Sequence, residues 1–285
     1  MTAAAAPHRV SFDPDPEGAT ATAQGTCPYG ELVTVTLAHG YVPVVVPRSP
    51  TTTLDEAVAG PGLGPSSFRN GMARGSVLGS VLGSVLGDTA LLRVRLERVR
   101  PFVALRTVRF TSPVELSAAL ELVSAERAWD GEAVDLVDGA VFSRQESYLV
   151  LGEWSDDVPA VSDYTGPGAY ASSLRERGRD ALTVPRYLWR WDTASRRRLG
   201  RGRLARERAE RDVVVPVERT AELLDEVLGH VPGRAPTGPL WLCPVRPGDH
   251  DVTSVPPAGG GRPWAPYPIG TDRTYVGVAV PVARR

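Results

Sequence analysis

Residues 101–110, 138–143 and 147–154 are rich in apolar, β-branched and aromatic residues, which is typical of strands. Between the first two segments a helical period begins after Ser112, with proline at the first helical position and Glu115 placed to complete a capping box. This part of the chain therefore predicts the order strand, helix, strand, strand.

The same order recurs toward the end of the chain. We expect a strand at 212–215, an amphipathic helix over 216–229, and further strands at 240–245 and 274–280. Two such units around a pseudo-twofold axis form one antiparallel sheet with both helices on one face, the ferredoxin-like arrangement. The sequence thus predicts an α+β fold in which this sheet is the second domain.

Shorter elements are expected near the N-terminus. Residues 9–13 and 19–24 predict a hairpin, residues 28–37 predict a helix with Gly40 as its left-handed cap, and residues 42–47 predict a buried strand. The alternation of strands and helices indicates an α/β lobe.

The unit Gly-Ser-Val-Leu is repeated three times between Gly75 and Gly87. Glycine at every fourth position disfavours a helix by roughly 1 kcal/mol per glycine relative to alanine. We interpret the repeat as a junction between domains. The expected division is 1–90 for the first domain, which includes the repeat, and 91–285 for the second.

The composition of the chain argues against several classes of enzyme and binding protein. All 32 basic residues are arginines, and without lysine the chain can form neither a Schiff base nor a P-loop phosphate site. The net charge of −1 provides no overall attraction to nucleic acid or anionic lipid. Eight arginines lie between Arg196 and Arg211, but glutamates at helical spacing predict a solvated face, so nucleic-acid binding is the weaker alternative.

Cys27 and Cys243 lie far apart without CxxC spacing, which argues against a disulfide framework and a cysteine-based zinc site. The four histidines are dispersed, and we predict no metal site. No apolar stretch approaches the roughly 20 residues of a membrane helix, and no signal peptide is recognised. We expect a cytoplasmic protein, and the arginine-rich composition suggests a bacterial source.

Three threonines, Thr51–Thr53, are followed by the glycine-rich stretch Gly60-x-Gly-x-Gly64. Small residues let backbone N–H groups approach a diphosphate closely, which bulky side chains would prevent. An ordinary turn is the alternative for such a loop.

Longer strings are more specific, and they follow one another through most of the chain. With the threonines and the glycine-rich loop, they resemble bacterial relatives of the Δ24-sterol reductases, in the vanillyl-alcohol oxidase superfamily. The resemblance implies a PCMH-type FAD-binding lobe, a substrate cap domain, FAD as cofactor and redox chemistry at a carbon–carbon double bond of a sterol- or isoprenoid-like substrate. By analogy NAD(P)H is a candidate electron donor. The strings are Ser67–Gly71, Pro101–Arg106, Asp138–Ser143, Glu146–Gly152, Ser162–Gly166, Tyr187–Asp192 and Leu240–Pro244.

The resemblance also implies which residues hold the cofactor. Backbone and hydroxyl groups of the loop would contact the diphosphate, and one arginine would offset its charge or tune the flavin. For that arginine, a surface ion pair is the alternative. The set is Thr51, Thr52, Thr53, Gly60, Gly62, Gly64, Ser66, Ser67 and Arg69.

Aromatic residues are the candidates for substrate chemistry. Tyr170, Trp189 and Trp191 are expected to line an apolar slot for a hydrophobic substrate. Tyr164 and Tyr187 are the candidate proton donors, because hydride delivery to one alkene carbon requires a proton at the other. Each of these rings is equally suited to a hydrophobic core.

One departure from the family pattern supports a second hypothesis. Where the relatives have two glycines, this chain has Asp55 and Glu56, and carboxylates close to a diphosphate repel it. The chain is also expected to be a shortened member. The alternative function is therefore a cofactor-less, non-catalytic remnant that serves as a ligand-binding or interaction protein.

Overall fold

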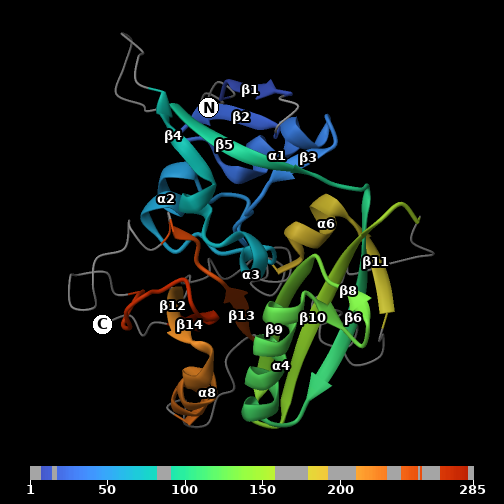
Figure 1. Cartoon of the computed structure of the whole chain (residues 1–285), viewed down its shortest axis with the longest axis vertical. Helices are drawn as coiled ribbons and strands as arrows, with labels where there is room; N and C mark the ends of the chain where they lie inside the picture. The colour runs from blue at the N-terminus through green and yellow to red at the C-terminus, as the bar shows by residue number, and fades with distance from the viewer. Residues whose placement is uncertain are drawn as a thin grey trace, which may run out of the picture.

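The computed structural model describes residues 8–14, 18–81, 91–157, 179–191, 210–229, 239–249, 251 and 264–281. These residues form two lobes, each built on a sheet, as Figure 1 shows with the first lobe at the top. All strand pairs in both sheets are antiparallel. The described part of the chain is thus a mixed helix-and-sheet structure with antiparallel sheets.

The first lobe contains a five-stranded sheet in the order β1-β2-β5-β3, with β4 also paired to β5. The expected hairpin and first helix are present, and Gly40 has the left-handed φ of 80° after that helix. The expected strand at 42–47 is shorter, because the chain leaves the sheet after Pro43. The elements are β1 (Val10–Asp13), β2 (Thr20–Gln24), α1 (Tyr29–Leu37), β3 (Tyr41–Pro43), α2 (Leu54–Ala59), α3 (Ser67–Asn70), η1 (Ala73–Ser76), β4 (Val77–Val81) and β5 (Leu91–Arg98).

The second lobe contains a seven-stranded sheet in the order β11-β6-β10-β9-β13-β14-β12. Both expected strand–helix–strand–strand units are present, and they meet where β9 pairs with β13. The elements are β6 (Phe102–Phe110), α4 (Pro113–Glu126), β7 (Ala128–Trp129), β8 (Glu132–Ala133), β9 (Leu136–Ser143), β10 (Glu146–Ser155), β11 (Arg179–Thr183), α6 (Val184–Leu188), β12 (Glu210–Pro216), η2 (Val217–Arg219), α8 (Thr220–Gly229), β13 (Leu240–Val245) and β14 (Tyr275–Pro281).

The start of α4 differs from the sequence prediction. The Ser112 side chain accepts a hydrogen bond from the N–H of Val114, so the capping box with Glu115 does not form. The helix ends at Glu126, and the next residue, Arg127, has a left-handed φ of 52° although it is not glycine. The sequence pattern thus located the helix correctly but not the hydrogen bonds at its N-terminus.

Two hydrophobic cores cover the two faces of the second sheet. One packs α4 and α8 against it, with Leu120 and Leu224 fully buried. The other joins the opposite face to the first lobe. Phe68 of α3, a first-lobe residue, is fully buried in the helix-side core. The lobes therefore share hydrophobic contacts.

The chain passes from the first sheet to the second between Arg98 and Phe102, because β5 pairs with β2, β3 and β4. The expected division at residue 90 would have placed β5 in the second unit. Part of the glycine repeat forms β4, which replaces the expected linker there, and residues 82–90 are outside the described part. That the two units are separate domains stays a prediction.

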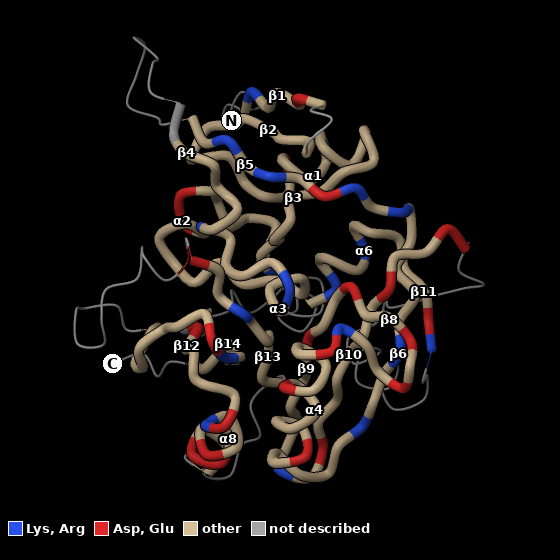
Figure 2. The backbone as a smooth tube through the Cα atoms, viewed as in Figure 1, with Lys and Arg blue, Asp and Glu red and all other residues tan. Residues whose placement is uncertain are grey.

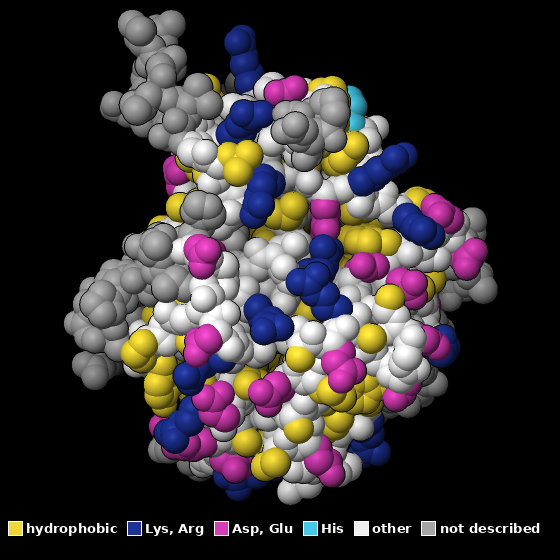
Figure 3. Space-filling view, in the orientation of Figure 1, with side chains coloured by type: hydrophobic (Ala, Val, Ile, Leu, Met, Phe, Trp, Pro, Cys, Tyr) yellow, Lys and Arg dark blue, Asp and Glu magenta, His cyan; other side chains and the backbone are white. Residues whose placement is uncertain are grey.

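The described charges are mixed in sign. Figure 2 shows arginines along β5 and mainly acidic residues on α8, and Figure 3 shows both signs interspersed over the visible face. The arginine run at 196–211 lies almost wholly outside the described residues. Among the described helices, none is long and apolar enough to cross a membrane.

Candidate functional site

The glycine-rich loop lies between α2 and α3 and is tightly packed. Gly62 has a left-handed φ of 51°, and a Cβ there would collide with the carbonyl oxygen of Ala57. A Cβ on Gly64 would collide with the carbonyl oxygen of Val46. Both positions require glycine, as expected for a loop of small residues, but the groups that approach them belong to the protein itself.

Several of the expected cofactor contacts are used inside the protein. The N–H of Gly60 donates to the Glu56 carbonyl at 2.8 Å, and the N–H of Gly64 donates to Ser67 Oγ at 3.0 Å. The Ser66 hydroxyl donates to the Val44 carbonyl at 2.7 Å. These groups hold the loop in its shape, so they reach a cofactor only if the loop rearranges.

The three threonines lie at the other end of α2. Thr53 caps this helix, because its Oγ1 accepts from the N–H of Glu56 at 3.3 Å while Glu56 Oε2 accepts from the N–H of Thr53 at 2.9 Å. A helix of this length separates its ends by roughly 9 Å. The structure therefore does not bring the threonines and the glycine loop to one point, and Glu56 occupies the backbone donor that a diphosphate would use.

Arg69 forms an ion pair within the first lobe, but it is mostly buried and is not the surface pair of the alternative interpretation; a further hydrogen bond from Arg69 reaches the second lobe. Its guanidinium lies 2.7 Å from Glu97 Oε2 on β5, with each side chain 17% exposed, and its Nε donates to the Asp135 carbonyl at 2.8 Å. Burial raises the pKa of Glu97 above its usual range, and the positive charge of Arg69 opposes that rise.

Two of the predicted aromatic residues lie together between the lobes. Tyr187, at the end of α6, and Trp191 are buried against an ion pair of Asp138 and Arg190. The Trp191 indole donates to Asp138 Oδ2 at 3.2 Å, and the Arg190 guanidinium lies 3.8 Å from the centroid of the Tyr187 ring. Trp189 is half-buried and packs against the core that joins the lobes.

The other two predicted aromatics, Tyr164 and Tyr170, lie outside the described residues. Their roles as proton donor and substrate contact stay predictions.

The polar groups of the cluster formed by Tyr187, Trp191, Asp138 and Arg190 are buried away from water. Burial raises the pKa of Asp138, and the positive charge of Arg190 opposes that rise. Burial likewise raises the pKa of the Tyr187 phenol, which stays protonated at neutral pH. Within the described part of the chain, Asp138 Oδ1 and the Tyr187 hydroxyl form no hydrogen bond of regular geometry, although the Trp241 indole lies close to Asp138 and the Arg190 guanidinium lies close to Tyr187. Such groups are uncommon in native proteins, and a ligand or a catalytic role is one reason for keeping them.

Cys243, on β13, connects the cluster to the glycine loop. Its buried thiol donates to the Gly64 carbonyl at 2.9 Å. Burial raises the pKa of Cys243, the negative charge of Asp138 adds to the rise, and a hydrogen bond with Ser67 opposes it. The structure therefore places Gly64 and Ser67 next to the cluster that contains Tyr187, and we call this region the interlobe site.

Three members of the interlobe site were not singled out from sequence. Asp138, Arg190 and Cys243 all belong to strings that carry the family resemblance, but none of them was assigned a role. A charged residue inside an apolar strand was the available signal, because such a charge needs a buried partner.

A cavity of about 490 Å³ lies on the outer face of the first sheet. Two arginines of β5 and apolar side chains line it, and no predicted site residue does. Its lining comprises Gly18, Ala19, Thr20, Val44, Asn70, Leu78, Arg93, Arg95 and Leu96.

The expected contacts that stay accessible to FAD lie in two separate places, before α2 and after it. The hydroxyls of Thr51 and Thr52 lie at or near the surface, and the N–H groups of Gly62 and Leu63 bond to no described part of the chain. Either pair of donors can reach a diphosphate. The inner donors, on Ser66, Ser67 and Arg69, are already engaged and do not fit it in this conformation.

No protein-family model and no curated protein sequence matches the chain. Solved structures do: berberine bridge enzyme from Eschscholzia californica matches with a TM-score of 0.52 and 18% identity, over 96% of this chain and 60% of that one. A single-residue variant of berberine bridge enzyme, described as a reticuline dehydrogenase, matches with the same score and identity over 97% and 60%. The chain therefore shares their fold and spans about 60% of their length.

Proposed function

We propose that this protein is an FAD-linked oxidoreductase that acts on a hydrophobic substrate at the interlobe site. The fold supports the proposal, because its structural neighbours are FAD-linked oxidoreductases of the vanillyl-alcohol oxidase superfamily. The strings that resemble the Δ24-sterol reductases favour a carbon–carbon double bond of a sterol- or isoprenoid-like molecule as the reacting group. In this proposal the first lobe is a partial PCMH-type domain and the second is a ferredoxin-like cap.

The observation that carries the proposal is the buried Tyr187 hydroxyl, which forms no hydrogen bond of regular geometry among the described residues and lies near Cys243, whose thiol bonds to Gly64. Leaving such a group unpaired costs roughly 1–3 kcal/mol. Proteins retain an unpaired buried group mainly where it has a function, and titratable residues with shifted pKa values concentrate at functional sites. We assign Tyr187 the task of holding a proton at its hydroxyl for the substrate.

Other residues would support Tyr187. Arg190 fixes the phenol ring from one face, and its own position is fixed by Asp138. Trp189 and Trp191 would form part of an apolar slot. When bound, FAD would supply the two-electron chemistry, with NAD(P)H as candidate donor, and its diphosphate would meet the outer donors at Thr51 and Thr52. The expected setting is the cytoplasm of a bacterium.

A second candidate function is binding without a cofactor. The Glu56 carboxylate already occupies the N–H of Thr53, and the Ser66 hydroxyl, the Ser67 N–H and the Arg69 guanidinium all donate within the protein. These contacts are what a ligand-binding or interaction protein that has lost FAD would show.

Titration with FAD and with riboflavin, followed by flavin fluorescence, tests the proposal. We expect saturable quenching with one FAD per chain and weaker binding of riboflavin, which has no diphosphate. Glu56→Gln should tighten FAD binding about 2–5-fold, because it removes a negative charge near the diphosphate while an amide oxygen keeps the cap. Glu115→Gln, the matched change in the first turn of α4, should have no effect. Absence of saturable FAD binding would support the cofactor-less candidate.

A further inference from the structure

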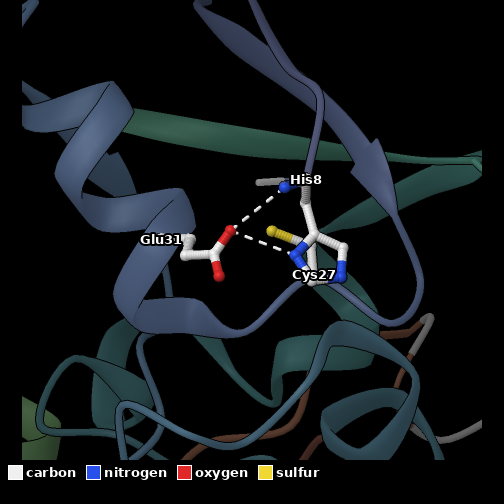
Figure 4. A group of neighbouring side chains, drawn as sticks. All are labelled: His8, Cys27 and Glu31. Atoms are coloured by element: carbon white, nitrogen blue, oxygen red, sulfur yellow. Dashed lines mark hydrogen bonds and ion pairs between the residues drawn. The ribbon is translucent and has the colours of Figure 1, made fainter. Parts of the chain in front are cut away.

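Three side chains that could bind a metal converge at the edge of the first lobe, away from the interlobe site. His8 comes from the segment before β1, Cys27 from the turn before α1, and Glu31 from the first turn of α1 (Figure 4). His8 Nδ1 lies 3.0 Å from Glu31 Oε2, and the three ligand atoms all lie within 4.8 Å of one another. The group supplies one nitrogen, one sulfur and one oxygen.

The fold holds these residues in place. Cys27 lies two residues before α1, and Glu31 is in the first turn of that helix, so the thiol and the carboxylate meet at the N-terminal end of α1. Phe12 of β1 stacks on His39 at the far end of α1, with ring centroids 4.3 Å apart. This contact and the antiparallel pairing of β1 with β2 keep the start of β1 beside α1, where His8 is also tied through its backbone N–H to Glu31.

We propose that Cys27, His8 and Glu31 bind one zinc ion, with the fourth coordination position open to water or another ligand. Thiolate, imidazole and carboxylate are the ligands that zinc takes in proteins. In a tetrahedral zinc site they lie roughly 3.3–3.7 Å apart, so the side chains need to move by about 1 Å or less. A thiolate and a carboxylate together neutralise the charge of the ion, which suits a partly buried site.

The three side chains differ in exposure, and the partly exposed ones leave a path by which an ion can enter. Cys27 is fully buried, whereas the side chains of His8 and Glu31 are 22% and 46% exposed. Without an ion, burial and the Glu31 charge raise the pKa of Cys27 to about 11, so the thiol is protonated. A divalent cation between the ligands reverses the local charge and favours the thiolate.

The absence of CxxC spacing excludes only zinc sites that are built on a pair of neighbouring cysteines. Here a single cysteine combines with a histidine 19 residues earlier in the chain, and only the fold brings them together. Bound zinc would cross-link the segment before β1 to the N-terminal end of α1. The ion would therefore stabilise the first lobe whether or not FAD binds at the interlobe site.

Metal content and cobalt spectroscopy of the full-length protein test the proposal. After loading with zinc and gel filtration we expect one zinc per chain, and with cobalt a thiolate-to-metal charge-transfer band in the near ultraviolet. Cys27→Ser and His8→Ala should each weaken zinc binding at least tenfold and, for Cys27→Ser, remove the band. Cys243→Ser, which removes the other buried cysteine, should leave both unchanged.

Two results would overturn the zinc site. One is wild-type protein that retains no zinc or gives no charge-transfer band, and the other is a Cys27→Ser protein that binds zinc as well as the wild type. If Cys27→Ser does not fold, Glu31→Gln provides the same comparison at a partly exposed position. Since neither readout involves flavin, failure of the zinc site and failure of the proposed redox function are separable.

Discussion

At the residue scale, the buried ion pair of Asp138 and Arg190 dominates the interlobe site. Both side chains are at most 1% exposed. Removing two charges from water is costly, and the pair is tolerated only because each charge compensates the other. Loss of one partner therefore leaves an uncompensated charge, which is a larger penalty than the pair's net contribution to stability.

Asp138→Asn should lower the free energy of unfolding by about 3–5 kcal/mol, because Arg190 would remain buried without its carboxylate. Asp225→Asn is the matched control. It breaks the 2.8 Å pair with Arg144, whose members are 51% and 56% exposed, and should change stability by less than about 1 kcal/mol. Urea unfolding measures both. Equal effects of the two changes would contradict the burial of the first pair.

Tyr187→Phe should leave the protein as stable or more stable by about 1 kcal/mol, because it removes a buried hydroxyl that forms no hydrogen bond of regular geometry among the described residues. The difference should grow at alkaline pH. Burial raises the folded-state pKa of Tyr187 above the ordinary value of 10.0, so the stability linked to its proton is present below pH 10 and lost as pH rises further. Urea midpoints measured from neutral to alkaline pH check this. A variant less stable at neutral pH would show that the hydroxyl is bonded.

At the element scale, the local pattern predicted most strands and helices, because helices bury one side that repeats every 3.6 residues and the central strands are short, almost wholly apolar runs. It could not predict which distant residues meet. Asp138 and Arg190 are 52 positions apart, and the threonines and glycine loop that looked contiguous are separated by α2. Tyr187 and Trp191 could be selected as candidates from their strings. The Asp138–Arg190 ion pair against which they pack could be found only from the tertiary structure.

The short helix α3 shows how one element links the lobes. Phe68→Ala should lower the free energy of unfolding by about 3–5 kcal/mol, because this ring is fully buried in the core under α4 and α8. Leu122→Ala, which truncates a side chain on α4 that is 46% exposed, should change it by less than about 0.5 kcal/mol. Chemical denaturation followed by circular dichroism gives both values. A small effect of Phe68→Ala would mean that the lobes do not share this core.

At the scale of the whole molecule, the fold matches that of berberine bridge enzyme, but the chain spans about 60% of the length of that protein. The glycine-rich loop has the small residues that let a diphosphate approach the backbone, but several of its hydrogen-bond donors bond to groups of the protein itself. Retention of the cofactor is thus the property on which the proposed redox activity depends.

The visible absorption spectrum of the purified protein, recorded before and after incubation with FAD and gel filtration, tests this property most directly. The proposed function predicts the two absorption bands of an oxidised flavin at close to one flavin per chain. A protein that folds and stays colourless after incubation with FAD would contradict it.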